Sequence, residues 1–512
     1  MQGESSIGSN RRIAKNTLLL YARTFITLAI SLYTTRVVLK TLGETDYGIY
    51  NVVGGVVVLF TFISNSTSSA IQRFLNFELG KTNNADVRKV FSMSVNVIVL
   101  IAAVIVILAE TLGLWFVNTQ LNIPEERITA ALWAYQLSVI TCCVTILRVP
   151  HNAAIIAYER MSFYAYLSII EAVLKLLLVF FLVFLSWDKL ILYSFLMLLV
   201  VVIINICYHL YCRSILSEIR YKSFWDKTLF YRLISFSGWS IFGSGAELCN
   251  TQGINLIINI FLGVTVNAAT GIATQVSNAV YSFVVNFQVA FKPQIVKLFA
   301  SGESEAFHKL IFRSSKVSYV LLSLIILPII INCSFILDIW LDEVPKFSSN
   351  FIIWTLLYYL IDSMSAPLWM AAQATGDIRK YQIWVSMSIL LNLPLAYLVL
   401  ALEISPVWVF VVKFIINFIT HFVRLAYLEK VRCVPFKSFL TAVMYPLLKM
   451  TIVAYPISLF LGIIMSDGWG KLLTTSLLSM VIISVAAYFI ILSKEERIML
   501  ITVVKSKLNI NI

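Results

Sequence analysis

The chain has 512 residues, of which 60% are hydrophobic and only 13% are charged, and its formal net charge is +13. Soluble domains typically contain roughly 25% charged residues, so this composition excludes a soluble multidomain protein and predicts an all-α polytopic membrane protein. The basic excess at first suggests nucleic acid as a partner. It is better explained by membrane topology, because the basic residues alternate from loop to loop.

The first apolar stretch, 16–39, carries two arginines within a length that can cross a bilayer, which requires about 20 apolar residues. A charge inside a span usually faces a wet or protein-lined cavity. Arg23 lies about 10 Å inside the stretch and is predicted to line such a cavity. Arg36 lies near the outer end, where it either lines the cavity or extends to the interface.

Fourteen apolar spans follow one another, with no soluble domain between them. They lie at about 16–39, 48–72, 90–117, 128–148, 162–186, 190–211, 233–262, 267–291, 312–337, 349–373, 380–402, 406–428, 438–465 and 471–492. Of the 39 lysines and arginines, 29 fall at the N-terminus, in every second loop or in the C-terminal tail, and the other loops hold five. The positive-inside rule therefore predicts that both termini are cytoplasmic.

Three features recur in order, at an offset of 217 to 225 residues. One span ends at Leu42-Gly43 and another at Leu262-Gly263; Phe74…Gly80 is answered by Phe299…Gly302; and Pro150, Ala154, Ala157 and Tyr164 are spaced like Pro367, Ala371, Ala374 and Tyr381. Such repeats are common in transporters. We predict two pseudo-symmetric six-helix lobes in a parallel repeat, at 1–212 and 233–430, joined by an amphipathic cytoplasmic connector at 213–232. A helix pair and tail follow at 431–512.

Further charges lie inside the spans. Lys175 stands four residues after Glu171, on the same helical face, so the two either neutralise each other or present Lys175 to a ligand. Lys292 is either an interface lysine or a cavity residue, and Lys413 lies deeper. Together with Arg23 and Arg36, these lysines are the candidate substrate-binding residues.

Two acids, Glu247 and Asp362, stand near mid-span without an obvious partner in their own helices. Buried carboxyl groups of this kind suit the coupling of transport to an ion gradient, and a structural hydrogen bond is the alternative. They are the ion-coupling candidates.

Several chemistries find no support in the sequence. The seven cysteines and four histidines show no metal-ligand spacing, and Gly80-Lys81-Thr82 lacks the first glycine of a phosphate-binding loop because position 75 is Leu75. We therefore expect no cofactor, no metal, no catalytic residues and no nucleic-acid partner.

The arginine-bearing first helix, the turn LGETDYGIYNVVGG, the segment RFLNFELGK, the duplicated lobes and the extra helix pair resemble the Wzx-type polysaccharide flippases. These belong to the MATE-like multidrug/oligosaccharidyl-lipid/polysaccharide exporter superfamily. The resemblance implies a transporter of the bacterial inner membrane that moves undecaprenyl-pyrophosphate-linked repeat units, such as O-antigen units for lipopolysaccharide, from the inner to the outer leaflet by alternating access. It also implies that a glycan polymerase or other assembly proteins are potential partners, and we expect the chain itself to be a monomer.

Two other functions stay open. A MATE-type multidrug or cation antiporter would favour acidic cavity residues and usually has twelve spans. A membrane glycan polymerase would usually carry a large outer loop with catalytic residues, whereas the longest predicted outer loops here, Asn118–Arg127 and Asp338–Ser348, have about ten residues.

Overall fold

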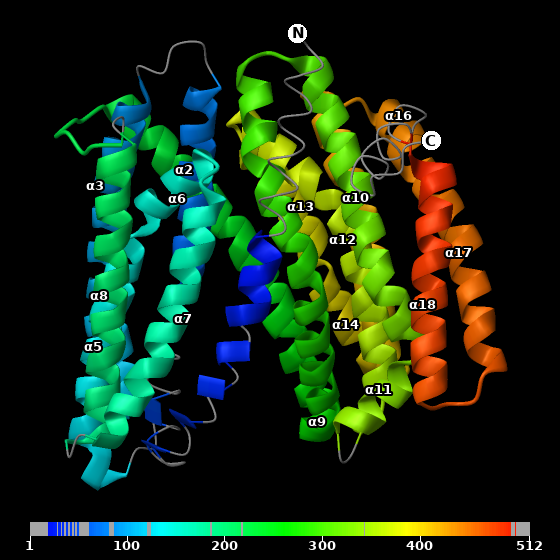
Figure 1. Cartoon of the computed structure of the whole chain (residues 1–512), viewed down its shortest axis with the longest axis horizontal. Coiled ribbons are helices and arrows are strands. Elements are labelled where there is room, and N and C mark those ends of the chain that lie inside the picture. The colour runs from blue at the N-terminus through cyan, green and yellow to red at the C-terminus, as the bar shows by residue number, and fades with distance from the viewer. Residues whose placement is uncertain are drawn as a thin grey trace, which may run out of the picture. The chain divides into compact units, whose positions relative to one another are not determined.

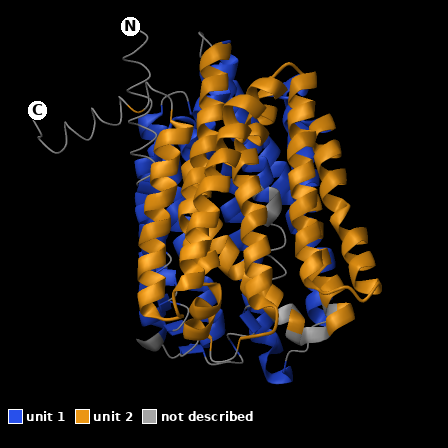
Figure 2. Cartoon of the chain, turned by 90° about the vertical axis from the view of Figure 1, so that its right-hand side faces the viewer, with its two compact units in different colours: residues 1–245, 290–302, 376–379 blue, residues 246–289, 303–375, 380–512 orange. Residues whose placement is uncertain are grey.

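A computed structural model describes residues 19–27, 29–31, 33–34, 37–38, 41–42, 46, 49–50, 61–80, 86–119, 124–184, 187–216, 219–341, 344–492 and 497. The chain divides into two compact units, coloured separately in Figure 2. Unit 1 comprises residues 1–245, 290–302 and 376–379, and unit 2 comprises 246–289, 303–375 and 380–512. The division comes after Gly245, within one helix, whereas the sequence places the connector between lobes at 213–232.

Unit 1 is built from the first helical stretch, Leu19–Ser31, and the helices that follow it. These are α2 (Thr61–Leu79), α3 (Val87–Leu108), α4 (Leu114–Thr119), α5 (Ile128–Leu147), α6 (Val149–Ala157), α7 (Met161–Phe184), α8 (Lys189–Ile215) and the ends of α9 (Lys227–Ala300). Helix α8 packs against both α5 and α7, and the three lie side by side in Figure 1. Small residues allow the tightest contacts: Ala153, Ala154 and Ala157 of α6 are fully buried, and α6 packs on α2.

The 74 residues of α9 are helical throughout, but the chain reverses direction between the two ends of this element. Ser244 bonds to Ser66 of α2 at 2.9 Å, and Lys292 bonds to Ser69 of the same helix at 2.7 Å. Ser244 and Lys292 are 48 residues apart (292 minus 244), so a straight helix would separate them by about 70 Å. The reversal agrees with the two spans predicted at 233–262 and 267–291.

One end of unit 1 gathers segments from three loops that the sequence predicts on the cytoplasmic side. The carboxylate of Glu159 accepts hydrogen bonds from Lys297 at 2.7 Å and from Gln294 at 2.8 Å. Gly80, at the end of α2, lies so close to this segment that an added Cβ would stand 2.6 Å from the Lys297 carbonyl oxygen. A larger residue at position 80 would therefore force α2 and α9 apart.

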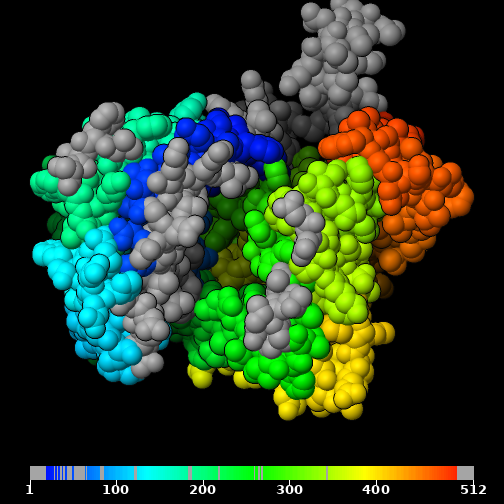
Figure 3. All heavy atoms as spheres, turned by 90° about the horizontal axis from the view of Figure 1, so that it is seen from below, coloured from blue at the N-terminus to red at the C-terminus, as the bar shows by residue number. Residues whose placement is uncertain are grey.

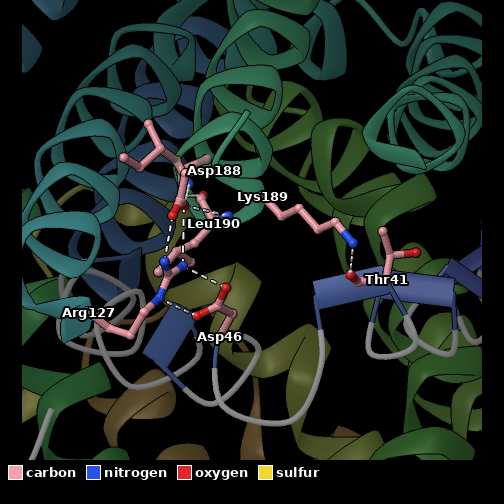
Figure 4. Close-up of polar contacts among 8 residues, drawn as sticks. Thr41, Asp46, Arg127, Asp188, Lys189 and Leu190 are labelled. Atoms are coloured by element: carbon pink, nitrogen blue, oxygen red, sulfur yellow. Dashed lines mark hydrogen bonds and ion pairs between the residues drawn. The ribbon is translucent and has the colours of Figure 1, made fainter. Parts of the chain in front are cut away.

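The opposite end of unit 1 gathers three loops that the sequence predicts outside (Figure 4). Arg127 forms a two-pronged ion pair with Asp46, at 2.8 and 2.6 Å, and also contacts Asp188 at 2.5 Å. Beside this cluster, Lys189 donates to the Thr41 carbonyl at 3.2 Å. The alternation predicted from the basic residues thus matches the grouping of loops at both ends of this unit.

We expect Arg127→Ala to lower the free energy of unfolding by about 1 to 3 kcal/mol, because it leaves two partly buried carboxylates close together without a cation. Arg127→Lys should recover only part of the loss, since lysine keeps the charge but cannot contact both carboxylates with a planar fork. The measurement is the thermal midpoint of the purified protein. Equal midpoints for wild type and Arg127→Ala would show that the cluster does not stabilise this end.

The same cluster predicts a pH dependence. Burial raises the pKa of Asp188, but hydrogen bonds from Arg127 and from the backbone N–H groups of Ile191 and Leu190 outweigh it and hold the pKa below its ordinary value. A lowered carboxyl pKa contributes stability above its unfolded value of about 3.9, and that stability is lost as the pH falls through the folded value. The difference between wild type and Arg127→Ala should therefore shrink below about pH 4.

Unit 2 contains the middle of α9 and the helices that follow. These are α10 (Ser304–Ile331), α11 (Cys333–Trp340), α12 (Ser348–Thr375), α13 (Arg379–Leu390), α14 (Asn392–Ala401), α15 (Val407–Lys430), α16 (Phe436–Phe439), α17 (Tyr445–Ile464) and α18 (Trp469–Ala486). Helix α12 is central, because it packs on both α10 and α15. Stacked rings of Phe351 and Phe410, 4.2 Å between centroids, and a hydrogen bond from Asn417 to the Tyr358 carbonyl hold α12 against α15.

The C-terminal pair, α17 and α18, packs on α10, as the orange to red and yellow-green surfaces of Figure 3 show. Polar side chains join them: Asn332, which follows α10, donates to Thr475 at 2.9 Å, and Tyr319 bonds to Thr451 at 2.8 Å. Within a membrane such hydrogen bonds hold helices together where the hydrophobic effect cannot. The pair that lies outside the predicted repeat is therefore attached to unit 2 through specific contacts.

Ten helices of the described chain are long and apolar enough to cross a membrane, from Val87–Thr119 to Trp469–Ile491. Each coincides with one predicted span. The other four predicted spans are 233–262 and 267–291, which lie within α9, and 16–39 and 48–72. The last two fall partly outside the described residues. The all-α membrane fold is confirmed, and the number fourteen agrees with it without being established.

Candidate functional site

A cavity of about 510 Å³ lies within unit 1 and is lined mainly by the first helix and helices α7 and α8. Polar side chains from several elements line it: Arg23 and Thr27 from the first helix, Asn152 from α6, Tyr164, Ser168, Glu171 and Lys175 from α7, Tyr208 from α8, and Arg148 between α5 and α6. A cavity of this size is within the range of small-molecule sites in proteins. Its polar lining is unusual for a space inside an apolar helix bundle.

Arg148, which lines the cavity, is the single residue between two consecutive helices. Helix α5 ends at Leu147 and α6 begins at Val149, with Pro150 in its first turn. Proline fits the first turn of a helix but has no N–H to continue the hydrogen bonding of the preceding one. The guanidinium of Arg148 lies 5.2 Å from the ring centroid of Tyr208 on α8.

One carboxylate serves two of the three cations in this cavity. Glu171 contacts Lys175 at 2.7 Å through one oxygen and Arg148 at 3.1 Å through the other. The side chains of Glu171 and Arg148 are each 19% exposed and that of Lys175 is 34% exposed. The pairing of Glu171 with Lys175 is therefore real, but it is shared, so it does not neutralise the cavity.

Arg23 is the third cation, and it has no carboxylate partner among the described residues. Its guanidinium lies 4.8 Å from the ring centroid of Tyr164, and its Nε is buried without a hydrogen-bond partner in the described part of the chain. A buried donor without an acceptor costs about 1 to 3 kcal/mol. An anionic ligand in the cavity would supply the missing acceptor.

The charges of this lining define what it can bind. Among the described lining residues, three cations and one carboxylate leave a formal excess of two positive charges. Two guanidinium groups provide planar donor forks that match phosphate oxygens, and the tyrosine, serine and asparagine side chains provide neutral hydrogen-bonding groups of the kind that sugar hydroxyls need. The arrangement suits a polar, doubly anionic ligand.

Two of the other predicted binding residues, Lys292 and Lys413, do not line this cavity. Lys292 donates to Ser69 in unit 1 and does not line the cavity. Lys413 belongs to unit 2, where its ammonium lies 4.8 Å from the ring centroid of Tyr358. Arg36 lies outside the described residues. Of the five predicted residues, the structure thus brings Arg23 and Lys175 together in one cavity.

The two predicted ion-coupling acids both lie in unit 2, but in different surroundings. Asp362 accepts a hydrogen bond from Tyr281 at 2.7 Å and pairs with Arg424 at 3.5 Å. Glu247 accepts only a long hydrogen bond of 3.4 Å from Tyr358 and has no ion-pair partner within 4 Å among the described residues. Asp362 is therefore an ion-paired carboxylate, whereas Glu247 interacts with the charge of Lys413 without forming an ion pair within 4 Å in the described part of the chain.

Sequence reasoning missed Arg148 and Arg424, because both were assigned to basic cytoplasmic loops. It also missed Arg73, which is buried against the rings of Phe74, Phe77 and Phe236. One signal was available for Arg148: it stands two residues before the repeated Pro150 motif, whose last member, Tyr164, packs against Arg23. Among the described residues, no three His, Cys, Asp or Glu side chains gather closely enough to hold a metal ion.

The fold is that of known transporters. It resembles a MATE protein in its straight conformation, with 12% identity, a TM-score of 0.67 and coverage of 83% of this chain and 96% of that one. A MOP superfamily transporter from Pyrococcus furiosus matches with 12% identity, a TM-score of 0.66 and coverage of 83% and 96%. The MATE transporter ClbM, in complex with Rb+, matches with 14% identity, a TM-score of 0.65 and coverage of 80% and 94%.

The chain is thus a multi-pass membrane protein with the fold seen in MATE transporters. A model of the MatE family matches residues 240–398, and a model described as polysaccharide biosynthesis protein matches residues 13–299. The second match covers more than half of the chain, which therefore belongs to the polysaccharide biosynthesis protein family. No curated protein sequence matches the chain significantly.

Proposed function

We propose that the protein is a flippase that carries undecaprenyl-pyrophosphate-linked oligosaccharide repeat units from the inner to the outer leaflet. The supporting observation is the cavity of unit 1, in which Arg148 and Lys175 share the carboxylate of Glu171 and Arg23 has no carboxylate partner among the described residues. A pyrophosphate that enters this cavity gains charge-assisted hydrogen bonds worth about 1.5 to 3 kcal/mol each. The match to the polysaccharide biosynthesis protein family supports a cargo of this kind.

The cavity also explains how a sugar-pyrophosphate could cross an apolar layer. Moving an unpaired charge from water into hydrocarbon has a very high free-energy cost. The headgroup therefore needs a path lined by charged and polar groups. The polyprenyl tail needs no such path, because it is as apolar as the lipid. In our proposal the protein holds the headgroup while the tail stays in the bilayer, and both termini are cytoplasmic in the bacterial inner membrane.

We propose further that Glu247 carries the ion that couples transport to a gradient, with Asp362 as a supporting residue. Of the two acids, Glu247 is the one without an ion pair within 4 Å among the described residues, so a proton or a small cation can be exchanged there without breaking such a pair. The similar fold of ClbM has been seen with Rb+, which supports the idea that this fold accepts alkali ions.

The test of the proposed cargo is transfer across a membrane by the purified protein. We expect proteoliposomes to move a fluorescent polyprenyl-pyrophosphate oligosaccharide between leaflets, measured by the fraction that an impermeant quencher reaches over time. The matched control is the same lipid with a neutral glycosidic link in place of pyrophosphate, which should move at least about tenfold more slowly because it cannot bond to the cations. Transport of organic cations without transport of the pyrophosphate lipid would instead support a multidrug antiporter.

A further inference from the structure

A second cavity of unit 1, of about 630 Å³, lies where α8 ends and the segment 219–226 begins. Its polar lining consists of Asn205, His209 and Arg213 from α8, His151 from α6, and Arg220 and Tyr221 from the segment. No acidic residue lines it in the described part of the chain. This cavity therefore differs from the first one, in which Glu171 accompanies the cations.

The two arginines of this cavity are exposed and form no ion pair with any described residue. Neither guanidinium, of Arg213 or of Arg220, has a hydrogen-bond or ion-pair partner among the described residues, and both side chains are exposed. The two histidines bond to each other, with 3.2 Å between Nδ1 of His209 and Nε2 of His151. In this bond one ring nitrogen donates and the other accepts, and neither ring carries a negative charge. The histidine pair therefore cannot replace a carboxylate as a partner of the arginines.

The segment that carries Arg220 is held in place rather than loosely attached. Tyr221 donates to the Asn96 side chain at 3.1 Å, Asn96 donates to the Phe224 carbonyl at 2.9 Å, and the Lys222 backbone N–H donates to Ser92 at 3.1 Å. All three bonds run to α3. The sequence predicts an amphipathic cytoplasmic connector here, and the structure shows a non-helical strip up to residue 226, so Arg220 is positioned before any ligand arrives.

An apolar path leads along α8 to these arginines. Ile206 and Leu210 are 51% and 57% exposed, although they lie within a candidate membrane span. They are four residues apart, and Arg213 follows three residues after Leu210, so all three share one helical face. The exposed rings of Tyr221 and Trp225 adjoin the same region in sequence, as is typical of residues at a membrane interface.

We propose that this cavity binds the phosphate headgroup of an anionic glycerophospholipid, with an acyl chain along the apolar face of α8. The guanidinium groups of Arg213 and Arg220 supply the donors for the phosphate oxygens, and basic cavities between helices at a membrane surface are suited to such headgroups. The apolar approach favours a lipid over a soluble phosphate, because a free ion would gain nothing from Ile206 and Leu210. The site is separate from the cargo cavity and does not depend on which cargo is carried.

The test is the binding of phosphatidylglycerol to the purified full-length protein, measured by native mass spectrometry. Wild type should bind phosphatidylglycerol in clear preference to phosphatidylcholine. The double variant Arg213→Ala with Arg220→Ala should bind it at least about tenfold more weakly, and the double lysine variant should retain most of the binding. The matched control is Arg160→Ala with Lys227→Ala, which removes two exposed basic residues outside the cavity and should stay within about twofold of wild type.

Three results would overturn the proposal. They are unchanged phosphatidylglycerol binding in the double alanine variant, equal binding of phosphatidylglycerol and phosphatidylcholine, and displacement of the lipid by free glycerol phosphate at equal concentration. If the double variant melts several degrees below wild type, the single variant Arg220→Gln, in the exposed strip, replaces it with the same expected direction.

Discussion

Arg23→Ala is expected to lower the rate of glycan-lipid transfer by about 10- to 100-fold. The variant removes the one cavity cation that has no carboxylate partner in the described chain, and a lost charge-assisted hydrogen bond of about 1.5 to 3 kcal/mol corresponds to that range. Arg23→Lys should recover part of the rate, since lysine keeps the charge but loses the planar fork that matches phosphate. The measurement is surface glycan at matched protein abundance, together with transfer in proteoliposomes.

The control and the combined variants separate a binding role from a folding role. Arg160→Ala, an exposed loop arginine of the same unit, should leave the rate nearly unchanged. Lys175→Ala and Arg148→Ala should have smaller effects than Arg23→Ala, because Glu171 already partners both residues. Full activity of a triple alanine variant of Arg23, Arg148 and Lys175 would show that the cations serve structure and that the cargo site lies elsewhere.

Glu247→Gln is expected to abolish the dependence of transport on the ion gradient while the protein still folds. Glutamine keeps the shape and can still accept the hydrogen bond from Tyr358, but it cannot exchange a proton or bind a cation through charge. The measurement is transfer by proteoliposomes with and without an imposed proton or sodium gradient. Gradient dependence equal to that of wild type would remove Glu247 from the coupling.

Asp362→Asn should give a different result, although both acids lie in unit 2. The substitution leaves Arg424, whose side chain is 11% exposed, without its carboxylate partner. Breaking such a pair on one side typically costs about 3 kcal/mol or more, so the main expected effect is a lower thermal midpoint. Loss of coupling with an unchanged midpoint in Asp362→Asn would instead make Asp362 the exchanging acid.

The membrane architecture could be predicted from the sequence because apolar length and basic alternation act along single helices. Spans such as 90–117 and 349–373 coincide with observed helices, since about 20 apolar residues have few alternatives to a spanning helix. Helix α9 shows that hydropathy predicts spans better than it predicts boundaries between compact units. Its two spans were predicted, but the boundary between compact units falls after Gly245, inside the first of them, which hydropathy does not indicate.

The site was less predictable because it depends on contacts between helices. A sequence shows that Arg23 and Lys175 stand inside spans, but it does not show that they share a cavity. Arg148 was assigned to a loop because it stands at the end of an apolar span, but in the structure α6 begins directly after it and its side chain contacts Glu171 of α7. The same limit applies to Asp362, whose partner Arg424 lies 62 residues away in sequence.

The sharing of Glu171 has a consequence for how fast a cargo can leave. Under the proposed function, each phosphate that binds Lys175 or Arg148 competes with a carboxylate already 2.7 and 3.1 Å away. When the cargo leaves, Glu171 can pair with Lys175 and Arg148 again at once. The barrier to dissociation is therefore lower than it would be for cations without a carboxylate beside them. Glu171 in this way limits residence time, and a carrier that must complete many cycles benefits from a ligand that it can release.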